Sequence, residues 1–124
     1  MAVKNDLAEI ERDVGSMSMF LQAGEYELKD LKSNLQNLQE LLVALAELRN
    51  GNEDWLNNNE EGTRKYRKVE EETGAMDDAE QALSEAEEEF LAMLKAKNPV
   101  EYKPIEIICC LDRACEYLTE AMGV

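Results

Sequence analysis

The chain has 124 residues, of which 44% are hydrophobic, 33% are charged and only 6% are aromatic. The apolar content argues against a disordered chain, and a compact domain of this length buries roughly two-thirds of the surface that it exposes when unfolded. The formal net charge of −15 excludes nonspecific adhesion to nucleic acid or to an anionic membrane, because both would repel the chain. We therefore expect no direct nucleic-acid binding and no membrane association, and a protein partner whose surface is basic or apolar.

The first residues, MAVKNDLAEIERD, are charged throughout and contain no apolar run that resembles a signal peptide or a membrane span. The chain also has three cysteines, an odd number that argues against a disulfide framework. Together these features predict a cytoplasmic protein in a reducing compartment.

Residues 3–49 carry apolar side chains at alternating spacings of three and four, a heptad pattern with fourteen seam positions. Only Gly24 and Arg49 interrupt it. The apolar members are Val3, Leu7, Ile10, Val14, Met17, Leu21, Leu28, Leu31, Leu35, Leu38, Leu42 and Leu45. Because a loop would normally shift this frame, the pattern predicts one long helix over 3–49. Its weak points are Gly15 and Gly24, where the helix either kinks or breaks into two.

The segment LLVALAEL, residues 41–48, is wider than a two-stranded coiled coil requires, because Leu41 and Leu48 lie beside the heptad seam. A broad apolar face of this kind is typical of a helix that touches more than one neighbour. We therefore include Leu41 and Leu48 among the candidate partner-binding residues.

Residues 50–62, NGNEDWLNNNEEG, are rich in Asn, Gly and Asp, which predicts a turn. Its oxygen ligands resemble the spacing of a calcium loop, but Trp55 stands where that loop needs Gly, so we expect no metal there. Trp55 and Leu56 are apolar residues in a polar turn. They either cap the end of a helical bundle or contact a partner.

A second helix is predicted over 63–97, and its stretch 70–89 is dense in carboxylates. Most of these side chains fall off the apolar stripe, which favours an outer, solvated face. The alternative is a surface that imitates nucleic-acid phosphates, for which Glu87, Glu88 and Glu89 are the candidate residues. The basic run at 64–68, RKYRK, is explained by charge pairs four residues apart that support the start of this helix, although a nucleic-acid patch is the alternative interpretation.

Both prolines lie in or beside a predicted linker, 98–103, and a third, shorter helix is predicted over 104–122. The β-branched residues of IEIICCL favour a strand instead, but no other segment offers a strand to pair with it. Cys109, Cys110 and Cys115 lie in this helix, where three thiols do not complete a zinc site. We expect them to be structural.

The chain has no His and no phosphate-binding Gly-rich loop. The absence of His removes the common catalytic triads and di-iron bundle sites, together with the commonest general base near neutral pH. The sequence therefore predicts no enzyme activity, no catalytic residues, no cofactor and no metal.

These patterns predict an all-α protein, a long antiparallel helical hairpin or coiled-coil-like bundle with a shorter third helix, in a single domain of residues 1–124. The second helix is too short to cover the whole of 3–49, so the stripe around Val3, Leu7, Ile10 and Val14 must meet the third helix or a second chain. We expect a homodimer through this stripe. The predicted function is a non-catalytic adaptor, assembly factor or small chaperone that binds protein through its apolar seam, and the alternative is an acidic inhibitor that mimics nucleic acid.

Overall fold

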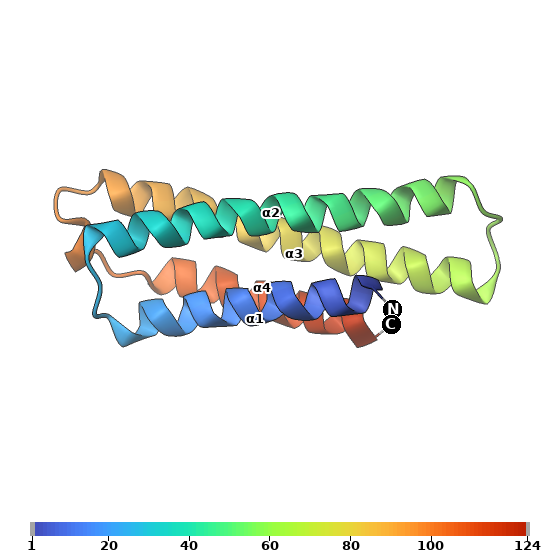
Figure 1. The fold of residues 1–124 in the computed structure, drawn as a ribbon, viewed down its shortest axis with the longest axis horizontal. Helices are drawn as coiled ribbons and strands as arrows, with labels where there is room; N and C mark the ends of the chain where they lie inside the picture. Colours follow the sequence, from blue (N-terminus) through green and yellow to red (C-terminus); the bar gives the residue numbers. More distant parts are fainter. Residues whose placement is uncertain (1, 124) are drawn as a thin grey trace.

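The computed structural model describes residues 2–123 as four α-helices that run alternately up and down (Figure 1). No strand occurs in this range, which confirms the all-α fold class. The segment IEIICCL is helical, so the strand alternative is wrong. The elements are α1 (Ala2–Ala23), α2 (Leu28–Asn57), α3 (Arg64–Lys95), a short 3₁₀ helix (Pro99–Glu101) and α4 (Ile105–Gly123).

The prediction of one helix over 3–49 is wrong, because the chain reverses direction between α1 and α2 (Figure 1). Gly24 has a positive φ of 71°, which a residue without Cβ adopts readily and which ends α1. A capping box between Glu27 and Asp30 then starts α2. The heptad frame stays in step across this reversal, and it therefore gave no sign of the loop.

The turn between α2 and α3 is shorter than the predicted 50–62, because α2 continues to Asn57. Trp55 and Leu56 therefore lie in the last turns of a helix and not in a loop. The second and third predicted helices, 63–97 and 104–122, match α3 and α4 closely. Thr63 caps α3, and its Oγ1 accepts a hydrogen bond from the backbone N–H of Tyr66 at 3.0 Å.

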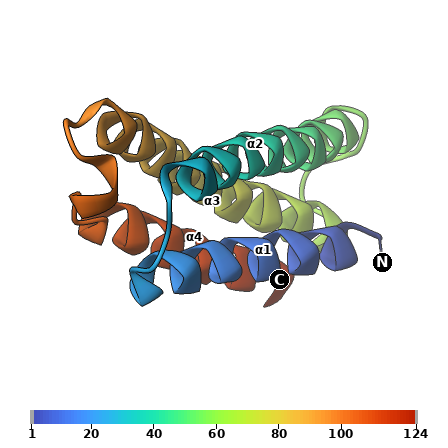
Figure 2. The ribbon, with the colours of Figure 1, turned by 60° about the vertical axis from the view of Figure 1, so that its left-hand side comes forward.

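The helices pack in the order α1, α4, α3, α2 (Figure 2), and each helix is closely packed against the next one in this series. The α1 and α2 helices, at the two ends of this series, contact each other only sparsely. The α2–α3 hairpin also projects past the termini (Figure 1), because α2 has 30 residues and α1 only 22. The bundle is therefore open along its α1–α2 side.

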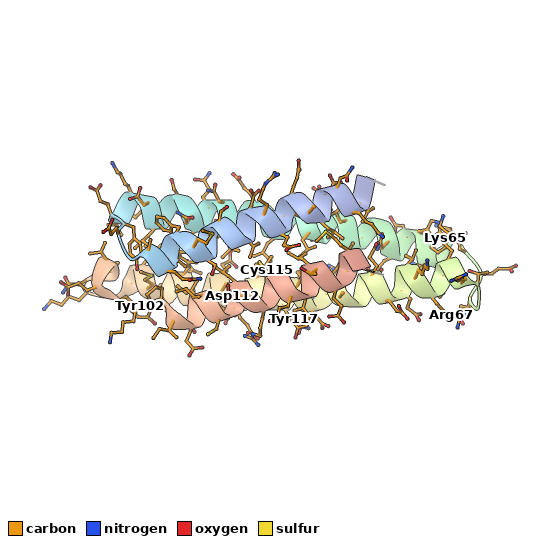
Figure 3. All side chains as sticks on the ribbon, turned by 90° about the horizontal axis from the view of Figure 1, so that it is seen from below. Lys65, Arg67, Tyr102, Asp112, Cys115 and Tyr117 are labelled. Atoms are coloured by element: carbon orange, nitrogen blue, oxygen red, sulfur yellow. The ribbon has the colours of Figure 1, made fainter. Side chains whose placement is uncertain are left out.

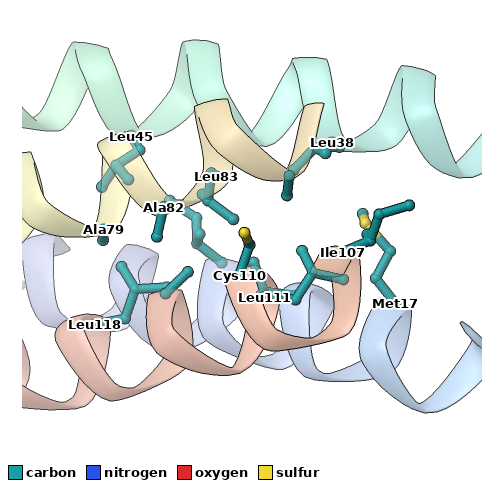
Figure 4. Close-up of a cluster of buried hydrophobic side chains, with 14 of the residues drawn as sticks. Met17, Leu38, Leu45, Ala79, Ala82, Leu83, Ile107, Cys110, Leu111 and Leu118 are labelled. Carbon is teal, nitrogen blue, oxygen red and sulfur yellow. The ribbon is translucent and has the colours of Figure 1, made fainter. Parts of the chain in front are cut away.

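The core runs along the bundle axis, and α3 contributes small residues to it that allow α2 and α4 to approach closely (Figure 4). Its larger members on α3 are completely buried. The buried residues of α3 are Thr73, Ala75, Met76, Ala79, Ala82, Leu83, Ala86, Phe90 and Met93. Because these residues occupy the inner sides of α3, the carboxylates of 70–89 lie outside the core and none of them is buried, although Glu72, Asp77 and Glu80 contact side chains of α2.

The apolar stripe of α1 packs against α4, with Leu7, Ile10 and Val14 buried in the core. Of the two partners that the sequence allowed, the third helix is therefore the one observed. This removes the argument that led to a homodimer, since no uncovered stripe of α1 remains at these three residues. The homodimer itself stays a prediction.

Candidate functional site: the groove between α1 and α2

A second apolar stripe runs along α2, beside the one buried against α3. Its residues are spaced three and four apart and face α1. They are Leu41, Ala44, Leu48, Gly51 and Trp55, and we call them the α2 stripe. Apart from Gly51, which has no side chain, the residues of the α2 stripe are only half-buried, whereas the core leucines Leu38 and Leu45 are fully buried. The segment LLVALAEL produces both stripes, because it places apolar residues in two adjacent heptad frames.

A hollow of about 550 Å³, which we call the middle hollow, lies between α1 and the middle of α2, at the start of the stripe. Its apolar lining is formed by Met17 and Phe20 of α1 and by Leu41 and Ala44 of α2. Polar residues surround this lining. They are Asp13, Ser16, Asn34, Asn37 and Glu40.

A second hollow of about 490 Å³ lies at the projecting end of α2, beside the start of α1. Val3, Leu48, Trp55 and Val69 form its apolar lining. Charged residues of both signs, Lys4, Glu47, Lys65 and Glu72, also border it, together with Gly51 and Asn52. We call the two hollows and the α2 stripe that joins them the α1–α2 groove.

Trp55 is held in place at the end of this groove by residues of α3. The Nζ of Lys65 lies 5.1 Å from the centre of the indole ring, within the range of a cation–π contact. The ring of Tyr66 lies 6.3 Å away. Figure 3 shows Lys65 and Arg67 at this projecting end, far from Tyr102 at the opposite end. Trp55 is therefore oriented by its neighbours while one part of its ring borders the groove.

Asn52 is a buried polar residue at the base of the same end. Its Nδ2 donates a hydrogen bond to Oε1 of Glu72 at 2.7 Å. This bond joins α2 to α3 and satisfies an amide that would otherwise be costly to bury. The end of the groove is therefore built on a fixed pair of helices, whereas its α1 wall packs mainly against α4 and contacts α2 only sparsely beyond the loop 24–27.

The structure brings together three of the seven predicted partner-binding residues. Leu41, Leu48 and Trp55 lie on one stripe, whereas the half-buried Leu56 does not line the groove. The acidic candidates Glu87, Glu88 and Glu89 lie on α3, outside both hollows.

On the opposite wall, sequence reasoning missed Met17 and Phe20 of α1 as contact residues, and it assigned Val3 to a homodimer stripe. It also missed Ala44. The regular spacing of residues 41, 44, 48 and 55 was the available signal for the α2 side. The α1 residues were not assigned to this groove, because α1 was taken as a continuation of α2 and not as its antiparallel neighbour.

Two of the three cysteines, Cys110 and Cys115, are shielded from solvent wholly or in part. Burial raises the pKa of the Cys110 thiol, and burial raises the pKa of Cys115 to about 11. Both thiols are therefore protonated and weakly nucleophilic at neutral pH. In the described part of the chain, no three potential ligands gather in a way that would hold a metal ion, and residues 50–57 form helix where the calcium loop was considered.

Neither a family model, nor a curated protein, nor a solved structure matches this chain. Among the described residues, no helix combines the length and the apolar character that crossing a bilayer requires.

Proposed function

We propose that this chain is a non-catalytic protein-interaction module and that its α1–α2 groove is the surface that binds a partner. A single observation carries the proposal. Leu41, Leu48 and Trp55 stand in line on one helix, half-buried, along the only side of the bundle where neighbouring helices in the described chain are loosely packed. Apolar grooves bordered by polar residues are typical of protein-binding sites.

The position of Trp55 supports this interpretation. Tryptophan is enriched among residues that dominate binding energy at protein interfaces. Here its ring is oriented by Lys65 and Tyr66, so little side-chain entropy remains to be lost on binding. The groove thus offers an anchor that is already positioned.

The proposal changes the surface that we expected from the sequence. The heptad seam is not free to bind a partner at Leu31, Leu38 or Leu45, because these side chains are fully buried within the chain. The adjacent α2 stripe takes over that role. The proposed module is an adaptor, an assembly factor or a small chaperone. We extend the proposal to a cytoplasmic location, because Cys109, Cys110 and Cys115 are free thiols, as is usual in a reducing compartment.

The test is affinity capture from native extract with three forms of the protein. The first is the wild type and the second carries Leu41→Ala with Leu48→Ala. The third is a matched control, Leu28→Ala with Leu91→Ala, which removes two exposed leucines outside the groove. We expect wild type and control to retain the same protein and the groove variant to lose it. Equal capture by all three forms, or capture by none, would contradict the proposal.

A second candidate function is the acidic inhibitor that mimics nucleic acid. It is favoured by the carboxylates of 70–89, none of which is used in the core, and several of which, such as Asp78, Glu85 and Glu88, are exposed. Binding of this kind weakens steeply between low and moderate salt, whereas an apolar groove binds almost equally at both. Charge reversal of Glu87, Glu88 and Glu89 would abolish the first kind of binding and leave the second intact.

A further inference from the structure

We infer that the occupant of the α1–α2 groove is a single amphipathic helix of a partner protein, with Lys or Arg residues flanking its apolar face. This inference rests on the proposed function, because it names the partner class of the same surface. Three properties of the groove support it: its shape, the charge of its middle hollow, and the net charge of the chain.

The shape of the groove matches a helix. Its apolar residues repeat at three and four along α2, which is the spacing into which side chains of an opposing helix insert. From Leu41 to Trp55 the stripe extends about 21 Å at 1.5 Å per residue, so a helix of roughly 14 residues covers it. The occupant would then complete the open side of the bundle and contact both α1 and α2.

The middle hollow selects a basic partner. Asp13 on α1 and Glu40 on α2 stand at its border and are exposed, and none of the described residues that line it is Lys or Arg. Two carboxylates on opposite walls favour cationic side chains above the apolar lining. The amides of Asn34 and Asn37 add hydrogen-bonding groups to the same border.

The end hollow has a different character. Lys4 and Lys65 border it together with Glu47 and Glu72, so the two signs of charge are balanced there. Its lining of Val3, Leu48, Trp55 and Val69 is apolar. We therefore expect the basic residues of the partner helix to lie over the middle hollow and its largest apolar residue to contact Trp55.

Charge also argues against a second copy of this chain as the occupant. Each copy carries a formal charge of −15, and docking would bring these charges together. A basic helix does not meet this cost.

The experiment uses two synthetic 18-residue helical peptides as probes. The basic probe has Leu at heptad spacing and Lys on both flanks, and the acidic probe is identical with Glu in place of Lys. Trp55 is the only tryptophan of the chain and borders the groove, so its fluorescence reports binding. We expect the basic probe to bind at least tenfold more tightly than the acidic one at low salt, with the ratio falling as salt increases.

A charge swap tests the position of the basic residues. In Asp13→Lys with Glu40→Lys, we expect the affinity for the basic probe to fall about tenfold or more and that for the acidic probe to rise. The matched control is Asp78→Lys with Glu88→Lys, which changes the net charge equally but lies on the outer side of α3. The control should alter either affinity much less.

The outcomes separate this inference from the proposed function. Equal binding of both probes, lost with Leu41→Ala and Leu48→Ala, would overturn the basic partner and leave the groove as a docking surface. Failure of both probes, beside groove-dependent capture from extract, would overturn the helical occupant alone. Light scattering of the wild type and of the variant with Leu41→Ala and Leu48→Ala provides the third result. A wild-type dimer that dissociates in this variant would make a second copy the occupant and overturn the inference.

Discussion

The guanidinium of Arg49 on α2 donates a hydrogen bond from Nε to Oε2 of Glu80 on α3 at 2.6 Å. It also contacts Glu53 through Nη1 at 2.9 Å and Asp77 through Nε at 3.1 Å. The hydrogen bonds to Glu80 and, to a lesser extent, Glu53 raise the pKa of Arg49. Arg49 interrupts the heptad pattern, and its ionic contacts replace an apolar contact between α2 and α3.

Replacing Arg49 by Ala should lower the free energy of unfolding by about 1–2 kcal/mol, because it removes charged hydrogen bonds and leaves three carboxylates close together. The side chain is 21% exposed, so solvent screening limits the loss. Urea denaturation measures the change. Arg67→Ala, at an exposed site on α3, is the control. Equal stability of the two variants would show that the Arg49 cluster contributes nothing.

Alanine substitution should have opposite effects at two glycines of the predicted continuous helix. Gly24→Ala is expected to destabilise by about 1 kcal/mol, because Ala tolerates the positive φ poorly. Gly15→Ala should stabilise by about 0.5–1 kcal/mol, because Gly15 lies inside α1 and an added Cβ meets nothing within 4 Å. Thermal unfolding of both variants checks the signs. If α1 and α2 were one helix, both substitutions would stabilise.

Two leucines of the same heptad frame should differ strongly. Leu45→Ala is expected to cost about 2–5 kcal/mol, because its side chain is fully buried between helices. Leu28→Ala should cost less than about 1 kcal/mol, since Leu28 starts α2 and is 41% exposed. Chemical denaturation of the pair gives both values. Similar losses would mean that Leu28 is covered in solution.

The buried thiol of Cys115 should make stability depend on alkaline pH. Its pKa is about 11 in the folded chain and near 9 when unfolded, so the folded state favours the protonated form. The resulting stabilisation is present below pH 9 and is lost as pH rises through 9 to 11, because the unfolded chain releases its proton first. The free energy of unfolding is measured against pH for wild type and for Cys115→Ala, and the difference between the two curves isolates this loss from other titrations. A difference between wild type and Cys115→Ala that does not change with pH would contradict this prediction.

Trp55→Ala separates binding from folding. Because Trp55 is half-buried at the projecting end, we expect a modest change in melting temperature. Binding of the partner should weaken by about 2 kcal/mol or more if the indole anchors the interface. Calorimetric titration and thermal unfolding of the same variant provide the comparison. A large loss of stability with unchanged affinity would assign Trp55 to capping the bundle.

The local features of the fold were predictable because they depend on neighbouring residues. The spacing of Leu83, Phe90 and their neighbours predicted α3, and the prolines at 99 and 104 predicted the break before α4. Leu41 and Leu48 were recognisable as an additional apolar stripe. The turn predicted at 50–62 is longer than the observed one. Asn and Gly residues favour turns, but a helix accepts them when its other side packs against a neighbour.

The pattern of apolar and charged residues was sufficient to predict an all-α fold and the side of each predicted helix that avoids water. Which helix covers which side was decided only by tertiary structure. The heptad frame is unchanged by the reversal at Gly24, so periodicity does not distinguish one long helix from two antiparallel ones. The backbone at that residue directs α1 onto α4 and leaves α2 with a partly uncovered stripe, and the groove exists because of that choice.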